Sequence, residues 1–187
     1  YPKAGDLGKK GRFLRVTHLI NGGYLHLAEV QVFAGKENLA LKGKATQIST
    51  GYAGPAKYGN DGNVDGNYQN KSVFHTEKAN DPWWEVDLGK ESQVDKVVVW
   101  NRMDSSTAAR LKKFRVELLD AKRHLVWSQE VAKTPKPSHA MALDGAEILN
   151  AVSLPHPREK GIFRLVNDLK KKAGMTLQDM DLVEINE

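Results

Sequence analysis

The chain has 187 residues, of which 40% are hydrophobic and 27% are charged, a balance typical of a folded soluble domain. It contains no cysteine, which excludes disulfide scaffolds, thiolate metal sites and cysteine catalysis. The net charge is +5, but the basic residues are scattered. The tightest basic cluster, at residues 170–172, is interpreted as a solvated helix end rather than a nucleic-acid patch, so we expect no nucleic-acid partner.

Most of the chain up to about residue 133 has the pattern of short β-strands. Segments 13–17 and 25–33 are strand-like, and residues 21–23 (Asn-Gly-Gly) predict a hairpin between them, because Asn and Gly tolerate a positive φ. Residues 84, 86 and 88 are apolar and alternate with acidic residues, which predicts a half-buried strand. The apolar run 97–100 predicts a core strand and is far too short to cross a bilayer.

Two further strands are predicted at 114–118 and 125–127, joined by a turn at 120–123. Near residue 134 the sequence pattern changes from short β-strands to a mixed segment followed by a helix. One amphipathic helix is predicted over 157–173, between Pro157 and Gly174, and is expected to pack on the sandwich. We therefore expect an all-β jelly-roll sandwich at 1–133 and an extension with a helical appendage at 134–187.

One polar loop is rich in metal-ligand residue types: residues 60–72 read NDGNVDGNYQNKS. Its Asp-x-Asn-x-Asp-Gly opening, from Asp61, fits an EF-hand loop, but position twelve is Ser72, which cannot supply a bidentate carboxylate. The flanks are also not helical. An EF-hand is therefore disfavoured, and two interpretations stay open: another kind of calcium loop, or a cluster of Asx turns.

The neighbouring segments resemble the F-type lectin (fucolectin) family, of the discoidin-like, galactose-binding jelly-roll group. The segments NLALKGKATQISTGY, NDGNVDGNYQNKSVFHT, DPWWEVDLG and VVVWNRMDSS occur in the order of that family. The resemblance covers residues 11–128. It departs in one respect, because the strand GRFLRVTHLINGGYLHLAEVQVF comes first here and last in typical members. We interpret this as circular permutation, with residues 1–34 supplying strands normally at the C-terminal end.

The resemblance implies a structural Ca²⁺ held by side chains and carbonyls. Glu29 is expected to supply the second carboxylate, with Glu184 as a less well matched rival. The implied ligands are Asp61, Asn63, Ser72, Glu29, Ala28 and Tyr58. Two carboxylates with neutral oxygens form a suitable set for this hard cation.

The resemblance also implies a sugar site. The family signature has twenty-six residues between a His and Arg-x-Asp, a spacing that His75, Arg102 and Asp104 satisfy. The next basic residue, Arg110, comes one residue late, and Ser105-Ser106 stands where members often carry cysteines. Arginine forks and a His can bind sugar hydroxyls, while an aromatic ring covers the apolar face; Tyr68 is the first candidate and Tyr52 a weaker one.

These observations predict a calcium-stabilised, non-catalytic module for fucose or a related neutral sugar, with fucose- or galactose-type glycans as partners. The alternative is a non-catalytic interaction module of the same fold with a degenerate sugar site, which binds protein or another ligand. A hydrolase using Glu85 and Asp87 is a third, disfavoured reading. The chain begins at Tyr1, which we interpret as a processed product or excised domain, secreted or extracytoplasmic. Oligomerisation, or a place as an accessory domain of a larger protein, would raise the avidity of a weak site.

Overall fold

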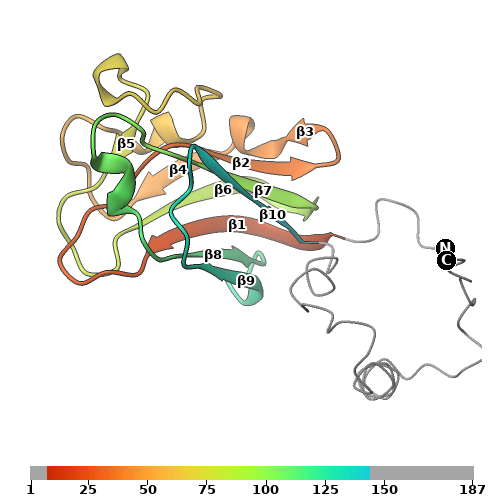
Figure 1. The fold of residues 1–187 in the computed structure, drawn as a ribbon. Helices are drawn as coiled ribbons and strands as arrows, with labels where there is room; N and C mark the ends of the chain where they lie inside the picture. Colours follow the sequence, from red (N-terminus) through yellow and green to blue (C-terminus); the bar gives the residue numbers. More distant parts are fainter. Residues whose placement is uncertain (1–7, 144–187) are drawn as a thin grey trace, which may run out of the picture. The chain divides into compact units, whose positions relative to one another are not determined.

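A computed structural model describes residues 8–143, which form two antiparallel β-sheets packed face to face (Figure 1). The first sheet has the strand order β4-β6-β1-β8-β9, and the second has β10-β7-β2-β3 with β5 also paired to β2. The strands are β1 (Lys9–His18), β2 (His26–Ala34), β3 (Glu37–Asn38), β4 (Lys44–Gln47), β5 (Phe74–His75), β6 (Trp83–Val94), β7 (Lys96–Asn101), β8 (Phe114–Leu119), β9 (Leu125–Val131) and β10 (Ser138–Ala142). Four 3₁₀ turns join them: η1 (Leu39–Lys42), η2 (Ala56–Gly59), η3 (Tyr68–Asn70) and η4 (Thr107–Arg110).

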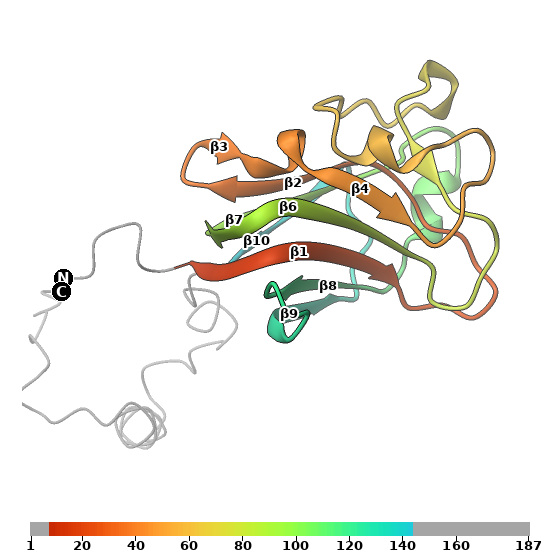
Figure 2. The same ribbon diagram turned by 180° about the vertical axis from the view of Figure 1, so that it is seen from behind.

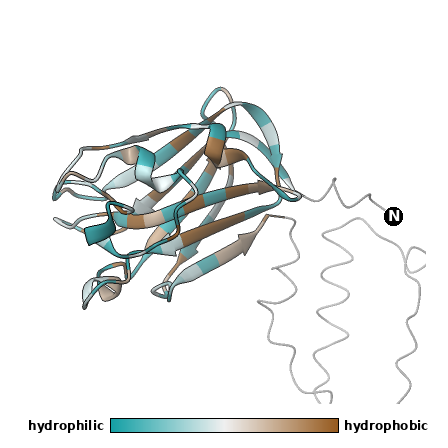
Figure 3. Cartoon of the chain, turned by 90° about the horizontal axis from the view of Figure 1, so that it is seen from above, coloured by the Kyte–Doolittle hydropathy of each residue, from teal (hydrophilic) through white to brown (hydrophobic). Residues whose placement is uncertain are grey.

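The core lies between the two sheets, and the alternation in the sequence places it correctly. Along β8, Phe114, Val116 and Leu118 are fully buried and their neighbours are partly exposed. Trp84 and Val86 on β6 are also fully buried. Apolar and polar residues alternate along the strands in Figure 3. Each inward side chain therefore gains burial free energy of about 1.5–3 kcal/mol, which holds the sheets together. The prediction of an all-β jelly-roll sandwich is confirmed.

The sandwich continues past residue 133, where the sequence pattern placed its end. Strand β10 pairs with β7 over Ser138–Ala142, and Met141 and Leu143 are buried in the core. The predicted helix at 157–173 and the rival ligand Glu184 lie outside the described residues.

Within the described part of the chain, no helix is long and apolar enough to span a membrane.

The hairpin predicted at residues 21–23 is wrong. Strands β1 and β2 belong to different sheets, so the connection crosses the end of the sandwich instead of folding back in one sheet. Gly23 exchanges both backbone hydrogen bonds with Ala79, at 2.9 and 2.8 Å, and the Gly22 N–H donates to Asn80 Oδ1 at 2.8 Å. Residues 21–23 do form a turn, but their hydrogen-bond partners lie in the distant loop at residues 79–80 and not in the next strand.

One corner of the sandwich brings three separate chain segments to Asp95. The Leu143 N–H donates to the Asp95 carbonyl at 2.7 Å, and the Gly35 N–H donates to the Asp95 carboxylate. A Cβ added to Gly8 would lie 2.6 Å from Asp95 Oδ1. The two ends of the described chain therefore lie at the same corner as the tight β2-β3 turn. Circular permutation itself stays a prediction, and this proximity is the geometry that it needs.

The opposite end of the sandwich gathers the long loops. The β1-β2 connection, the segment between β4 and β5 with η2 and η3, and the β7-β8 connection with η4 all emerge there (Figures 1 and 2). The predicted sugar-binding residues come from these loops or from the strand ends beside them. The fold thus brings residues from distant parts of the sequence to one end, as is common for binding sites on β-sandwiches.

Candidate functional site

His75, at the end of β5, lies at the centre of a ring of aromatic side chains. Its ring centroid is 4.6 Å from that of Tyr52, 5.4 Å from Tyr24, 6.3 Å from Tyr68 and 5.0 Å from His26. His26 lies directly across from His75 in the β2-β5 pairing. The His75 ring is therefore fixed by strand pairing on one side and by tyrosine contacts on the others.

The protonation state of His75 follows from its surroundings. Burial is the main cause that lowers the pKa of its imidazole, and the charges of Arg102 and Arg110 lower it further. The ring is therefore neutral at pH 7. Nδ1 lies 2.7 Å from the Thr76 carbonyl, which can only accept, so Nδ1 carries the proton. Nε2 is left as a hydrogen-bond acceptor.

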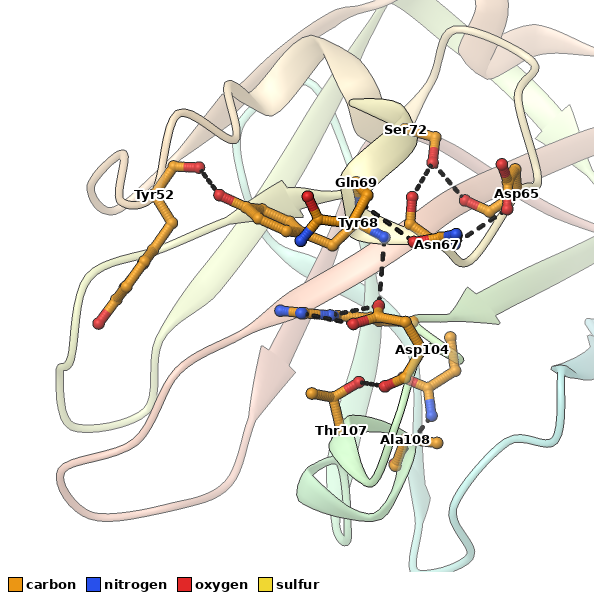
Figure 4. A network of polar contacts seen from close by, with 11 residues as sticks. Tyr52, Asp65, Asn67, Tyr68, Gln69, Ser72, Asp104, Thr107 and Ala108 are labelled. Atoms are coloured by element: carbon orange, nitrogen blue, oxygen red, sulfur yellow. Dashed lines mark hydrogen bonds and ion pairs between the residues drawn. The ribbon is translucent and has the colours of Figure 1, made fainter.

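Arg102, which follows β7, is held by a carboxylate and by an aromatic face. Its Nε and NH2 donate to the two oxygens of Asp104, each at 2.7 Å, and its guanidinium lies 4.6 Å from the Tyr68 ring centroid. Asp104 also accepts from the Tyr68 backbone N–H at 3.1 Å (Figure 4). These bonds, first of all those from Arg102, lower the pKa of Asp104 to about 2. One carboxylate thus joins the β7-β8 connection to the 60–72 loop.

A cavity of about 610 Å³ lies between these groups. It brings together His75, Arg102, Arg110 and Tyr68 from the predicted set, and also Tyr52. Asp104 does not line it but holds Arg102 in place. The other lining residues are His18, Ile20, Gly23, Tyr24, His26 and Lys112. The late position of Arg110 does not remove it from the site, because the extra residue lies in the segment that winds into η4.

The 60–72 loop is shaped by a ladder of Asx turns with a period of two residues. The side chains of Asp61, Asn63, Asp65 and Asn67 each accept from the backbone N–H two residues further on, at 2.9, 3.1, 2.9 and 3.1 Å. Ser72 Oγ donates to the carbonyls of Asp65 and Asn67, at 2.6 and 3.1 Å (Figure 4). The Asx-turn interpretation of this loop is therefore confirmed, and it does not exclude a bound cation.

Comparison with known proteins finds related galactose-binding and lectin domains. The family of NedA-like, galactose-binding domains matches residues 58–148. A fucose-binding module of Streptococcus pneumoniae is 37% identical, with a TM-score of 0.55 over 59% of this chain and 77% of that one. The lectin domain of lectinolysin, solved with Lewis B antigen, is 40% identical, with a TM-score of 0.56 over 57% of this chain and 77% of that one.

The chain belongs to the F-type lectin family. Fucolectin-3 of Anguilla japonica is 43% identical over 74 residues, which are 37% of this chain and 41% of that protein. The chain therefore spans about two fifths of the length of this curated relative. Three of the four segments that carried the resemblance contribute Tyr52, Tyr68, His75 and Arg102 to the cavity of the lectin domain, and one of the three contains the polar loop.

Beside the polar loop of the lectin domain, a buried carboxylate has the chemistry of a cation ligand. Glu29 on β2 is fully buried; its Oε1 accepts from the Gly62 N–H at 3.1 Å, while its Oε2 is buried without a partner. Burial is the main cause that raises the pKa of Glu29 to about 7, and the charge of Asp61 adds to it. A cation would satisfy the free oxygen and offset the repulsion between the two carboxylates.

The neutral members of the predicted ligand set lie on the surrounding segments. Ala28 is at a bulge of β2, where the pairing with β7 shifts register, so it has no partner in that ladder. Tyr58 is in η2, and Asn63 and Ser72 are in the loop. Within residues 8–143 no three His, Cys, Asp or Glu side chains cluster as a metal site. With only two carboxylates, the predicted set would need these neutral oxygens to complete the coordination.

Glu85 and Asp87, the pair considered for hydrolysis, are engaged by arginines. Glu85 accepts from Arg15 at 2.9 Å and from Arg123 at 2.9 and 3.1 Å, and Asp87 accepts from Arg12 at 2.8 and 2.9 Å. Arg12 is the main cause that lowers the pKa of Asp87, which disfavours a proton-donating role. In the lectin domain this pair forms a charged network on the outer face of the first sheet.

Tyr24, His26 and Lys112 line the cavity but were not predicted. His26 is only 2% exposed, and both of its ring nitrogens are buried without a partner. Burial, followed by the charges of His75, Arg102 and Arg110, lowers its pKa to about 3. The one available signal was the alternation of Tyr24 and His26 with buried leucines at the start of β2. Their position opposite His75 depends on strand pairing, which the local sequence does not reveal.

Proposed function

We propose that this lectin domain binds fucose or a related neutral sugar in the cavity beside His75. The observation that carries the proposal is the convergence of His75, Arg102 and Arg110, from three distant segments, on one aromatic-walled cavity. The names of the relatives support the same ligand class: one is a fucolectin, one a fucose-binding module, and one is a lectin domain in complex with Lewis B antigen.

The hydrogen-bonding groups of the cavity complement those of a sugar. His75 Nε2 accepts a hydroxyl proton, while the two guanidiniums donate to hydroxyl or ring oxygens. Arg102 enters binding already oriented, because Asp104 and the Tyr68 ring hold it, so little side-chain entropy is lost on binding. The rings of Tyr52 and Tyr68 supply apolar surface for the carbon face of the sugar.

Calcium is part of the proposal. Asp61 and Glu29 would bind Ca²⁺ together with oxygens of Asn63, Ser72, Ala28 and Tyr58. The ion would supply a fixed positive charge to a loop with little apolar surface. The free buried oxygen of Glu29 supports this assignment. We also propose a secreted or extracytoplasmic location, where millimolar calcium would fill even a weak site.

Binding rather than catalysis is favoured by the state of the acidic residues. Glu85 and Asp87 are paired with arginines on the outer sheet face, and neither lines the sugar cavity. A general acid would need a raised pKa, but the pKa of Asp87 is lowered. The groups that do line the cavity can bind a sugar without transforming it.

The test is a calorimetric titration of the full chain with L-fucose and with galactose, with and without EDTA. We expect saturable binding of at least one of the two sugars. His75→Phe keeps the ring packing but removes the Nε2 acceptor, so it should abolish binding with little change in melting temperature. Arg102→Ala should abolish binding as well.

The matched control is His124→Phe, because His124 is an exposed histidine on the β8-β9 turn, where it contacts Asp120. This variant should bind like the unmodified protein. Absence of saturable binding by the unmodified protein would refute the sugar-binding proposal and leave the interaction module with a degenerate site as the better reading.

A further inference from the structure

The cavity carries more positive charge than a neutral sugar requires. Arg102, Arg110 and Lys112 line it, and no carboxylate does. Asp104 neutralises Arg102 through two hydrogen bonds. Arg110 and Lys112 make no ion pair or side-chain hydrogen bond with any other residue in the 8–143 segment. Two cationic groups therefore face the same cavity without protein partners.

The backbone explains why both cations point into the cavity. Leu111 lies between them in an extended conformation, with φ −81° and ψ 92°, and is only 2% exposed. In an extended segment, alternate side chains point to opposite sides. Burial of Leu111 therefore turns Lys112 away from the core, while Arg110, the last residue of η4, lines the cavity from the 3₁₀ turn. Lys113, the next residue, pairs with Glu130 at 2.7 Å and does not line the cavity.

Nearby acidic residues do not neutralise this pair. The charge of Glu77 acts on His75 and that of Asp81 acts on His18, but neither carboxylate lines the cavity. Both are exposed to solvent, which screens them. A cavity that has charges of one sign and apolar walls focuses the electrostatic field of those charges on a bound ligand.

We propose that the site recognises a fucosylated glycan that also carries an anionic group, with Lys112 as its specificity-determining residue. The anionic group is a sulfate ester or a carboxylate on the sugar next to the one held by His75. The Lys112 ammonium offers either oxyanion a point charge with three N–H donors, while Arg110 remains available to the neutral sugar. The cavity volume of about 610 Å³ lies in the range of ligands larger than one sugar ring. This inference rests on the proposed function.

The experiment compares three matched oligosaccharides by calorimetry with the full chain. One is a neutral fucosylated trisaccharide, the second carries a sulfate ester on its galactose, and the third carries a terminal sialic acid. We expect at least one anionic form to bind about tenfold more tightly than the neutral form at low salt. The preference should fall in 0.5 M salt, because salt screens charge pairs near the surface. The arm that gains affinity identifies the anionic group.

Variants connect the preference to Lys112. Lys112→Gln should reduce the ratio of anionic to neutral affinity several-fold, and Lys112→Glu should bring the ratio below one. Lys113→Gln is the matched control and should leave the ratio unchanged. Equal binding of all three glycans, or a preference unaffected by Lys112→Glu, would overturn the inference while leaving the neutral-sugar site in place. Absence of binding to all three would overturn both proposals.

Discussion

Arg102 and Asp104 form a two-bond pair, each bond 2.7 Å long, and Asp104 simultaneously accepts from the Tyr68 backbone N–H. The cavity arginine is thus positioned by a carboxylate that does not itself line the cavity. We expect Asp104→Asn to weaken sugar affinity about tenfold, since an amide cannot accept both guanidinium bonds. Calorimetry would measure the loss. Asp120→Asn, on the distant β8-β9 turn, is the control, and equal affinity of the two variants would contradict the positioning role.

Sugar affinity should begin to fall at a lower pH than it would for a site with an exposed histidine. An exposed histidine is about half protonated at pH 6.5, but burial lowers the pKa of His75, so its Nε2 is an acceptor in more than half of the molecules at that pH. The pKa of Asp104, at about 2, keeps that carboxylate charged throughout. Titrations at pH 7.5 and 6.0 would check this. A loss of affinity in step with a group of pKa 6.5 would show that His75 titrates like an exposed histidine.

Removal of calcium should make the stability of the fold depend on Glu29. Because the pKa of Glu29 rises from 4.5 to about 7 in the fold, its stabilising contribution is present below pH 4.5 and is lost as pH rises through 7. In EDTA at pH 7.5, Glu29→Gln should therefore raise the free energy of unfolding by about 3 kcal/mol, since one pKa unit corresponds to about 1.4 kcal/mol. The same variant should abolish the gain in melting temperature on adding Ca²⁺.

The control for this experiment is the difference between variant and unmodified protein at each pH. The depressed pKa of His26 acts in the opposite sense, because its stabilising contribution is lost as pH falls below 6.5. The His26 contribution is common to both proteins and cancels in the difference. If Ca²⁺ raises the melting temperature of Glu29→Gln as much as that of the unmodified protein, Glu29 is not a ligand. Asp61→Ala gives the same test for Asp61.

The predicted circular permutation can be tested by opening the chain between Gly35 and Lys36 and joining its present ends. A chain that runs from Lys36 to Leu143, then through a short flexible linker to residues 8–35, should fold and bind the same sugar. The expectation follows from Asp95, which contacts both Leu143 and the Gly35 turn and lies beside Gly8. Circular dichroism melting and calorimetry would measure the outcome. A chain opened instead between Val98 and Val99, inside a core strand, should not fold.

The sequence predicted those parts of the fold that depend on local alternation. The alternation of Phe114, Val116 and Leu118 with polar residues predicts a half-buried strand without other information. Burial of one face of a sheet requires an apolar residue at every second position. The crossing between β1 and β2 could not be predicted in this way. An Asn-Gly-Gly turn has the same local chemistry whether the chain returns to its own sheet or passes to the other.

The residues of the candidate site also fall into two groups: those that the sequence predicted and those that only the folded structure reveals. The spacing of the family's motifs predicted five site residues from loops that meet in the fold: His75, Arg102, Asp104, Arg110 and Tyr68. The neighbours of His75 on other segments were missed, since His26 reaches it only through pairing of β2 with β5. Lys112 was missed because its direction depends on the burial of Leu111. Contacts set by non-local pairing require the folded structure.

The Asx ladder in the 60–72 loop has a consequence for how this loop can vary. Its repeating unit is two residues, one that accepts through its side chain and one that separates it from the next acceptor. Insertion of one residue would break this alternation, whereas insertion of an Asx-containing pair would add one more step. Length variants of the loop should therefore be tolerated in steps of two, which provides a design rule for reshaping the rim of the cavity that Tyr68 lines.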